Sequence, residues 1–213
     1  MNIISFCLWG SNPKYTIGAI KNAILALDIY PGWKCYFYVS NDVPREIIRE
    51  LESIGNTTIY NMGDGNWNSM FWRFYPACIK DAVLIVRDTD SRLGHREKCA
   101  VDAWLKSDKD FHIMRDHSYH ATRILGGMWG VRNNKLYNMQ KLIGKFDMKN
   151  CYDTDQEFLR SVIYPMICDS VCIHDEFFDR MPFPAEAQKR THTYFVGQAY
   201  DHNDNPLFDE RHI

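Results

Sequence analysis

The chain has 213 residues, of which 46% are hydrophobic and 24% charged, and its formal net charge is −2. This globular mixture excludes a disordered, collagenous or coiled-coil chain. The lack of a basic surplus argues against nucleic acid and anionic membrane surfaces as partners. No apolar run approaches the roughly 20 residues of a spanning helix, so membrane insertion is not expected. Seven cysteines without a C-x-x-C pair favour reduced thiols in a cytoplasmic protein.

Strands and helices alternate through the first half of the chain. Short apolar runs predict strands, and apolar residues spaced by three or four predict helices. The expected strands are 2–9, 35–39, 57–60 and 82–86. The expected helices run from Pro13 to before Pro31, over 44–54 and over 69–80. The apolar stripe of the first helix is predicted to be Ile17, Ile20, Ile24 and Leu27. This order indicates an α/β domain with a mostly parallel sheet.

The second half is less regular, and it shows no linker, so a single domain over residues 1–213 is expected. The predicted strands are 111–114, 171–173 and 194–196, and the predicted helices are 134–143 and 155–163. Gly126-Gly127-Met128-Trp129-Gly130 is typical of a tight turn, and residues 201–213 of a polar surface tail.

Two acidic residues directly follow the apolar run 82–86, which is typical of a parallel strand covered on both faces. Ligands of such sheets bind beyond the carboxyl ends of the strands. Carboxylates at i and i+2 of an extended chain share one face, and their oxygens suit Mg²⁺ or Mn²⁺. Asp88 and Asp90 are therefore candidate metal ligands. The alternative is a structural turn in which these carboxylates bond to backbone N–H groups.

The D-x-D pattern occurs twice more. Asp108-Lys109-Asp110 lies among lysines and is most simply a solvated turn. Asp153-Thr154-Asp155 opens a predicted helix, where an N-cap with acidic first-turn residues is an alternative to a role in ligand binding. Of the three pairs, the one formed by Asp88 and Asp90 is the pair that follows a strand predicted to be buried.

The stretch from Arg73-Phe74-Tyr75-Pro76 to Val86-Arg87-Asp88-Thr89-Asp90-Ser91-Arg92 resembles the GT-A nucleotide-sugar glycosyltransferases, especially their retaining glycogenin-like and mannosyltransferase-like branches. The resemblance implies a GT-A type, Rossmann-like sandwich with a mostly parallel central sheet and a smaller acceptor-side subregion. Residues 1–92 would form the nucleotide-binding half and residues 93–213 the sugar and acceptor half.

This resemblance implies a metal-dependent enzyme that moves a hexose or deoxyhexose from a UDP-sugar to a glycan or glycoprotein acceptor, expected to be a viral capsid glycan. Mn²⁺ or Mg²⁺ held by Asp88 and Asp90 would offset the charge of the departing diphosphate. Retention is expected; an inverting enzyme would instead use Asp155 or Glu157 as general base. A location in the cytosol, that of the host if the protein is viral, and further domains after residue 213 are also expected.

The same resemblance assigns further site residues. Arg73 matches the arginine that supports the donor site, and Trp9 ends the strand beside the uracil. Gly127 belongs to a glycine turn that lets the donor sugar approach the main chain, although an ordinary tight turn explains it equally well. Asp155, in the Asp-Gln element, is the candidate catalytic residue at the reactive face of the sugar. Four tryptophans are candidates either for stacking on a base or sugar or for the core: Trp9, Trp67, Trp72 and Trp129.

For several other residues the sequence leaves more than one role open. Related families supply a third metal ligand from a histidine near the carboxyl terminus; here His192 is two residues out of register and Tyr194 occupies the matching place. Asp116 and His117 are candidates for binding sugar hydroxyls or acceptor, or for packing within their own loop. Residues 61–70 are a candidate lid. Arg87 and Arg92 are candidates for further fixed positive charge.

Two other functions fit parts of the pattern. Aspartyl-phosphate phosphatases of the haloacid dehalogenase type resemble D-x-D-x-[TV], but here Arg92 occupies the last position and the motif lies in mid-chain rather than on the first strand. A non-catalytic sugar-binding domain on the same scaffold is the third possibility.

Overall fold

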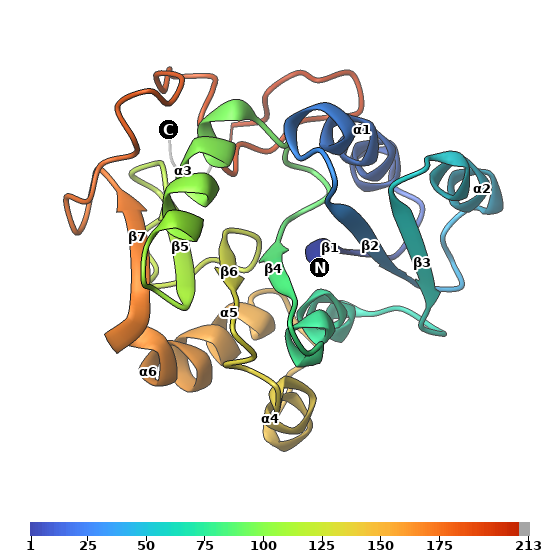
Figure 1. The fold of residues 1–213 in the computed structure, drawn as a ribbon. Coiled ribbons are helices and arrows are strands. Elements are labelled where there is room, and N and C mark those ends of the chain that lie inside the picture. Colours follow the sequence, from blue (N-terminus) through green and yellow to red (C-terminus); the bar gives the residue numbers. More distant parts are fainter. Residues whose placement is uncertain (209–213) are drawn as a thin grey trace.

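Residues 1–208, which the computed structural model describes, form a seven-stranded sheet in the order β3-β2-β1-β4-β6-β5-β7 (Figure 1). The strands are β1 (Asn2–Leu8), β2 (Lys34–Val39), β3 (Thr57–Asn61), β4 (Val83–Val86), β5 (Phe111–Arg115), β6 (Trp129–Val131) and β7 (Val171–Asp175). The separate helices are α1 (Pro13–Ile29), α2 (Arg45–Ser53), the 3-10 helix η1 (Trp67–Cys78), α3 (His95–Lys106) and α4 (Met139–Lys145). A continuous helical run before β7 comprises α5 (Thr154–Phe158), a π-helical turn η2 (Leu159–Ile163), α6 (Tyr164–Ile167) and a 3-10 turn η3 (Cys168–Ser170).

The sheet is mostly parallel, as predicted. Strands β3, β2, β1 and β4 pair in parallel, and β5 pairs in parallel with β7. The short strand β6 runs antiparallel between β4 and β5. Because Ser5 pairs with Val86 and Leu8 with Val39, the carboxyl ends of β1, β2 and β4 meet at one edge. None of the helices within residues 1–208 has the length and apolar character needed to cross a membrane.

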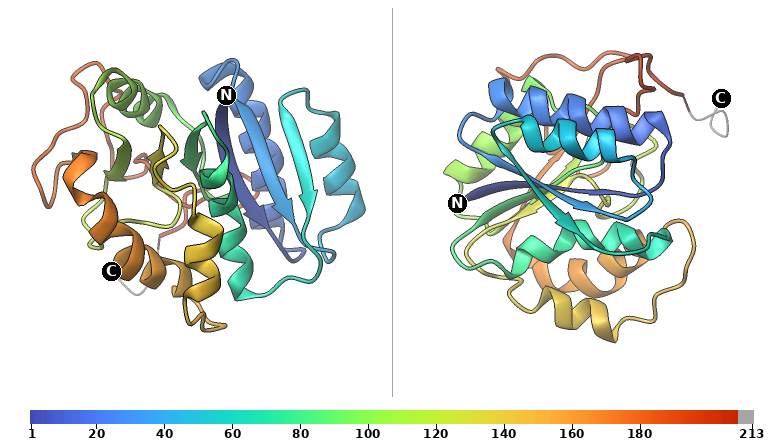
Figure 2. Two further views of the ribbon diagram at one scale, coloured as in Figure 1. Left: turned by 60° about the horizontal axis from the view of Figure 1, so that its bottom comes forward. Right: turned by 90° about the vertical axis from the view of Figure 1, so that its right-hand side faces the viewer.

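Helices cover both faces of the sheet (Figure 2). On one face, α1, α2 and α3 enclose a core that includes Ile4, Phe6 and Leu8 of β1. On the other face, η1, α4 and the α5–α6 run enclose a core that includes Ile3. The alternation of side chains along a strand therefore directs Cys7, an odd-numbered residue of β1, to the face covered by η1.

Helix α1 does not pack by the predicted stripe. Ile24 and Leu27 are 53% and 52% exposed, and the buried positions are mostly small. The reason is close packing: a Cβ on Gly18 would lie 2.2 Å from the main-chain oxygen of Thr89. A small-residue face lets α1 approach the turn after β4, and this approach brings the amino terminus of α1 to the carboxyl edge of the sheet.

Several predictions for the second half are wrong. Residues 194–196 form an irregular loop, and the predicted helix over 134–143 is shorter and begins at Met139. Helix α3 and strand β6 were not predicted. The glycine turn is confined to Gly126 and Gly127, whereas Gly130 lies within β6, where a Cβ would be 2.9 Å from the main-chain oxygen of Leu84.

The polar segment after residue 200 is partly fixed to the domain. Asp204 forms ion pairs with Lys21 of α1 and with Arg92, at 2.8 Å from the latter. The remainder of the predicted tail, residues 209–213, lies outside the described residues.

A buried histidine pair makes the fold acid-sensitive. His112 Nε2 lies 2.8 Å from His174 Nδ1. Burial lowers the pKa of His174 to about 4 and holds the pKa of His112 well below 6.5. Below pH 6.5 the unfolded chain binds protons that the folded chain excludes, so stability is lost as the pH falls from 6.5 toward 4.

We expect the free energy of unfolding to fall by up to roughly 1.4 kcal/mol per pH unit for each histidine in this interval. Urea denaturation at pH 7, 6 and 5 measures this slope. A His174→Gln variant should show a shallower slope, and the exposed His202→Gln variant should match the native chain. Constant stability between pH 7 and pH 5 would show that the pair does not titrate as described.

Candidate active site

A cavity of about 620 Å³ lies at the edge where β1, β2 and β4 end. Its walls come from the end of β1 and the loop to α1, from η1, from the turn after β4, and from the segment that opens α5. The sequence-predicted residues Trp9, Arg73, Asp88, Asp90 and Asp155 all line it. The fold thus brings together residues that are up to 146 positions apart in the chain.

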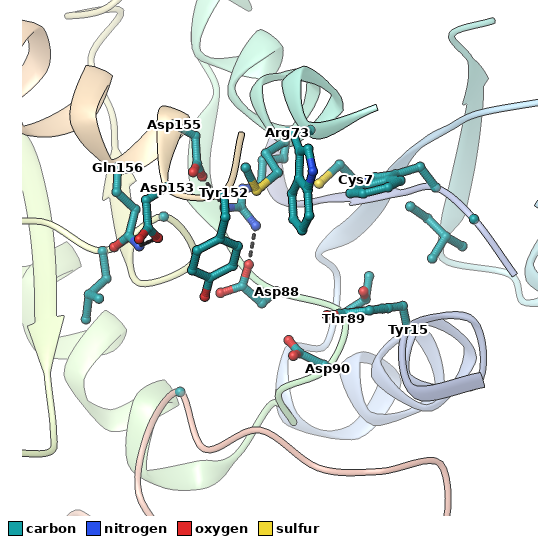
Figure 3. Close-up of a pocket in the computed structure, with 18 of the residues that line it drawn as sticks. Cys7, Tyr15, Arg73, Asp88, Thr89, Asp90, Tyr152, Asp153, Asp155 and Gln156 are labelled. Carbon is teal, nitrogen blue, oxygen red and sulfur yellow. Dashed lines mark hydrogen bonds and ion pairs between the residues drawn. The ribbon is translucent and has the colours of Figure 1, made fainter. Parts of the chain in front are cut away.

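Arg73 holds two carboxylates at the base of this cavity (Figure 3). Its Nη1 donates to Asp88 Oδ1, and its Nη2 donates to Asp155 Oδ2 at 2.6 Å. Arg73 is 5% and Asp155 2% exposed. Burial alone would lower the pKa of Arg73, but Asp88, Cys7 and Asp155 raise it, so the guanidinium is charged. Burial raises the pKa of Asp155, and Arg73 opposes this shift.

Asp90 has a separate cationic partner. Lys14 Nζ, in the first turn of α1, lies 2.8 Å from Asp90 Oδ2. Burial raises the pKa of Asp90, and the charge of Asp88 raises it further, whereas Lys14 lowers it. The two carboxylates are therefore close enough to repel each other, and both are directed into the cavity (Figure 3).

The turn that carries these carboxylates is fixed by other groups. Asn22 Nδ2 donates to the main-chain oxygens of Thr89 and Ser91, and Tyr200 N donates to the main-chain oxygen of Asp90. The principal partner of each carboxylate is a basic side chain. The alternative in which Asp88 and Asp90 mainly bond to the backbone of their own turn does not describe this arrangement.

The pair fits a small divalent cation as two of its ligands. Two mutually repelling carboxylates in a partly desolvated cavity provide the oxygen donors that Mg²⁺ and Mn²⁺ prefer. Within residues 1–208 no group of three or more His, Cys, Asp or Glu residues forms a complete metal site. His192 is exposed and stacks on Phe208, and neither it nor Tyr194 lines the cavity. Water and donor oxygens would fill the remaining positions.

The two glycines of the predicted turn provide room for the ionic cluster. A Cβ on Gly127 would lie 2.1 Å from Asp88 Oδ2. A Cβ on Gly126 would lie 2.4 Å from Arg73 Nη2 and 2.8 Å from Asp155 Oδ2. Gly126 lines the cavity, whereas Gly127 lies behind the Asp88 carboxylate.

Aromatic rings form one wall of the cavity. Trp9 and Trp67 meet edge to face with their centroids 5.2 Å apart, and Trp67 meets Tyr152 in the same way at 5.6 Å. The other two candidate tryptophans belong to the core: Trp129 is fully buried, and Trp72 is partly buried against the same cluster. The candidate lid, residues 61–70, contributes Trp67 and Met70 to the lining.

Several candidates lie outside the cavity lining. Arg87 is buried in an ion pair with Glu97 at 3.1 Å, and Arg92 bonds to Asp204 and the main chain, so neither supplies charge to the cavity. Asp116 is fully buried and accepts two hydrogen bonds from Arg96 at 2.7 and 2.8 Å. Of the two interpretations of Asp116, the structure favours packing within the scaffold over binding of sugar or acceptor. His117 and Glu157 do not line the cavity either.

Cys7 and His120 of the lining were not predicted, nor was Lys14, which lies outside the lining and pairs with Asp90. Lys14 could have been found, since it follows the first strand at the edge where ligands bind. Burial raises the pKa of Cys7 to about 12, so its thiol is neutral. Burial lowers the pKa of His120 to about 3, and His120 Nδ1 accepts a hydrogen bond from Asp116 N. No local pattern in the sequence marks Cys7 or His120.

Comparisons with known proteins support the fold. Neither the protein-family models nor the curated proteins include a match. Solved structures do match. A glycosyltransferase involved in the glycosylation of the major capsid of PBCV-1 shares 16% identity, with a TM-score of 0.51, over 82% of each chain. S. aureus TarS shares 8% identity, with a TM-score of 0.54, over 82% of this chain and 58% of that one.

A third match is glucosyl-3-phosphoglycerate synthase from Mycobacterium tuberculosis in complex with Mn²⁺, UDP-glucose and phosphoglyceric acid. It shares 13% identity, with a TM-score of 0.50, over 89% of this chain and 72% of that one. The chain has the GT-A fold. At this level of identity the likeness concerns the fold, and the activity is inferred from the cavity itself.

Proposed function

We propose that this protein is a metal-dependent glycosyltransferase that moves a sugar from a UDP-sugar to a glycan or glycoprotein acceptor. One observation carries this proposal: a single buried arginine, Arg73, bonds to both Asp88 and Asp155, with Asp90 lining the same cavity. This arrangement joins a candidate metal-binding pair to a carboxylate suited to contact the transferred sugar.

The donor end of the cavity would be built around Asp88 and Asp90. These residues would hold Mn²⁺ or Mg²⁺, which acts when bound as a Lewis acid for the departing diphosphate. Arg73 provides fixed positive charge in a site of low water content, where such charge stabilises developing anions most strongly. Lys14, which is paired with Asp90 at 2.8 Å, provides a second positive charge next to the cavity. Trp9 would contact the base, and Gly127 keeps Asp88 in place.

The sugar end would be built around Asp155. Its ion pair with Arg73 fixes the orientation of the carboxylate, so we assign it to orienting the sugar and stabilising positive charge near C1. Glu157 is not available as a general base, because it lies outside the cavity lining and pairs with Arg160. A fixed Asp155 supports transfer with retention, in which the leaving phosphate takes the acceptor proton. The anomeric configuration of the product, read by NMR, distinguishes retention from inversion.

The wider setting is also a proposal. A viral capsid glycan as acceptor and a location in the host cytosol follow the expectation drawn from the sequence, and one protein of similar fold is itself involved in glycosylating the major capsid of PBCV-1. Division into a nucleotide-binding half (1–92) and an acceptor half (93–213) agrees with a cavity whose walls come from both segments.

UDP release from a panel of UDP-sugars with Mn²⁺ and no acceptor tests the function. The native chain should hydrolyse at least one donor slowly, and Asp88→Asn should reduce the rate at least about 100-fold, as expected when charge stabilisation of the leaving group is lost. Asp108→Asn, from the solvated D-x-D, is the matched control and should match the native rate. Phosphate release from a phosphomonoester would favour the phosphatase. Glycan binding without UDP release and without response to Mn²⁺ would favour a sugar-binding domain.

A further inference from the structure

The charges that line the cavity argue against an acidic acceptor. Among the described residues that line it, Arg73 is the cationic side chain, and Lys14, which lies outside the lining, pairs with Asp90 of the lining. Both are already paired with carboxylates of the cavity wall. The anionic side chains of the lining are Asp88, Asp90, Asp153 and Asp155, so carboxylates exceed cations by two even when Lys14 is counted. A bound divalent cation would offset this excess, but a nucleotide diphosphate would restore it.

No basic side chain of the lining is left to receive an acidic acceptor. Arg123 belongs to a neighbouring loop, outside the lining, and faces Asp179 at 4.0 Å. Asp153 is the exposed carboxylate near Asp155 in the lining, and it accepts a hydrogen bond from Gln156 Nε2 at 2.8 Å. A phosphate or carboxylate on the acceptor would therefore meet like charge as it enters.

The same end of the cavity has exposed aromatic surface. The side chains of Tyr152 and Trp67 are 57% and 38% exposed. They remain exposed although their rings meet edge to face, with centroids 5.6 Å apart. Tyr152 precedes Asp153 in the chain and extends past it toward Asp88 (Figure 3). Large exposed rings with polar tips are typical of surfaces that bind ligands having one apolar face and polar edges. The C–H face of a pyranose has this character.

We infer that the acceptor is an uncharged pyranoside that packs against the corner formed by Trp67 and Tyr152, beside Asp153. This inference rests on the proposed glycosyltransferase function. Tyr152 shares its segment with Asp153 and Asp155, whereas Trp67 also meets Trp9, so Tyr152 forms the side of the aromatic corner that faces the sugar end. The acceptor class thus differs from that of the M. tuberculosis enzyme, whose complex contains phosphoglyceric acid.

Matched acceptors test the charge requirement. Transfer from the UDP-sugar that the native chain hydrolyses is measured with nitrophenyl glucosides, galactosides, mannosides and xylosides, and with the 6-phosphates of the three hexosides. The native chain should transfer the sugar to at least one neutral glycoside. Where that glycoside has a 6-phosphate in the panel, kcat/KM should be at least 10-fold higher for the neutral compound than for the phosphate. Asp153→Asn should narrow this ratio about 5-fold, as removal of one charge at several ångströms predicts. Preference for a phosphorylated member, or no use of any neutral member, would overturn the inference.

Aromatic variants test the corner. Tyr152→Ala should lower kcat/KM for the neutral acceptor at least 10-fold and leave acceptor-free UDP release within about 2-fold of native. Trp67→Ala, which also removes the ring contact with Trp9, should lower kcat/KM for the neutral acceptor at least 10-fold. Tyr152→Phe should restore most of the activity. Tyr137→Ala, a 67% exposed tyrosine outside the cavity, is the matched control.

These measurements distinguish failure of the acceptor assignment from failure of the proposed glycosyltransferase function. If both alanine variants lose UDP binding in parallel with transfer, the corner holds the nucleotide and the inference is wrong, although the enzyme stands. If the native chain neither binds nor hydrolyses any UDP-sugar, the proposed function itself fails.

Discussion

Replacing Arg73 with methionine should abolish transfer and destabilise the fold by about 3–5 kcal/mol, the usual cost of leaving a buried carboxylate unpaired. Asp155 would carry most of this cost because it is 2% exposed, whereas the Asp88 side chain is 42% exposed and is partly screened by water. Without the guanidinium, the like charges of Asp88 and Asp155 would also repel each other. Chemical denaturation and UDP release measure the two effects.

The destabilisation caused by Arg73→Met should depend on pH in a defined direction. Burial already raises the pKa of Asp155, and the loss of Arg73 removes the main opposing influence. A carboxyl group whose folded pKa lies above its unfolded value costs stability as the pH rises through the folded pKa. The deficit of the variant should therefore be larger at pH 8 than at pH 5.

A second buried arginine offers a matched control. Arg96 bridges Asp116 at 2.7 Å and Glu176 at 3.0 Å, outside the cavity lining. Arg96→Met should lose a similar amount of stability but keep UDP affinity and donor hydrolysis at a temperature where it is folded. Equal loss of hydrolysis in both variants would mean that Arg73 acts only through stability.

Gly127→Ala should inactivate the enzyme with a smaller loss of stability. The added Cβ would lie 2.1 Å from Asp88 Oδ2 and 2.9 Å from Asp88 N, so the carboxylate and its turn must shift. Overpacking of this kind costs about 1–3 kcal/mol. Because the proposed metal site depends on the position of Asp88, we expect UDP release to fall at least about 100-fold.

Gly144→Ala provides the comparison for that substitution. Gly144 lies in α4, and a Cβ there meets no atom within 4 Å. The variant should be as stable as native or more stable, by up to roughly 1 kcal/mol, because alanine favours helix over glycine. Its activity should be native. Native-like activity of Gly127→Ala would show that the Asp88 position is not critical.

The positions of the candidate site residues were easier to predict from the sequence than the details of the fold. Asp88 and Asp90 follow an apolar strand, and the rule that ligands bind at carboxyl strand ends predicted their place at the edge of the sheet that carries the cavity. Arg73 and Asp155 came from family resemblance, and their shared ion pair has no local signature because 82 residues separate them. The same limit applies to Lys14, whose pairing with Asp90 depends on how closely α1 packs.

The predictions of the fold were wrong where tertiary packing overrides the local hydrophobic or glycine pattern of the sequence. In α1 the apolar residues Ile24 and Leu27 face outward, because the helix needs its small residues against the turn after β4. Strand β6 was hidden within a glycine-rich stretch, since Gly130 serves close packing against β4 rather than a turn. Arg87 and Asp116 look like site residues in sequence, but both are used in buried ion pairs of the scaffold.

Calorimetric titration of UDP with and without Mn²⁺, on the native chain and on Asp90→Ala, determines whether Asp88 and Asp90 hold a cation that binds the nucleotide. The native chain should bind UDP at least about 10-fold more tightly with Mn²⁺ than with a chelator, since the cation joins two carboxylates to the diphosphate. Asp90→Ala should lose this gain, and Asp108→Ala should keep it. Equal UDP affinity with and without the metal, or an undiminished gain in Asp90→Ala, would contradict the account.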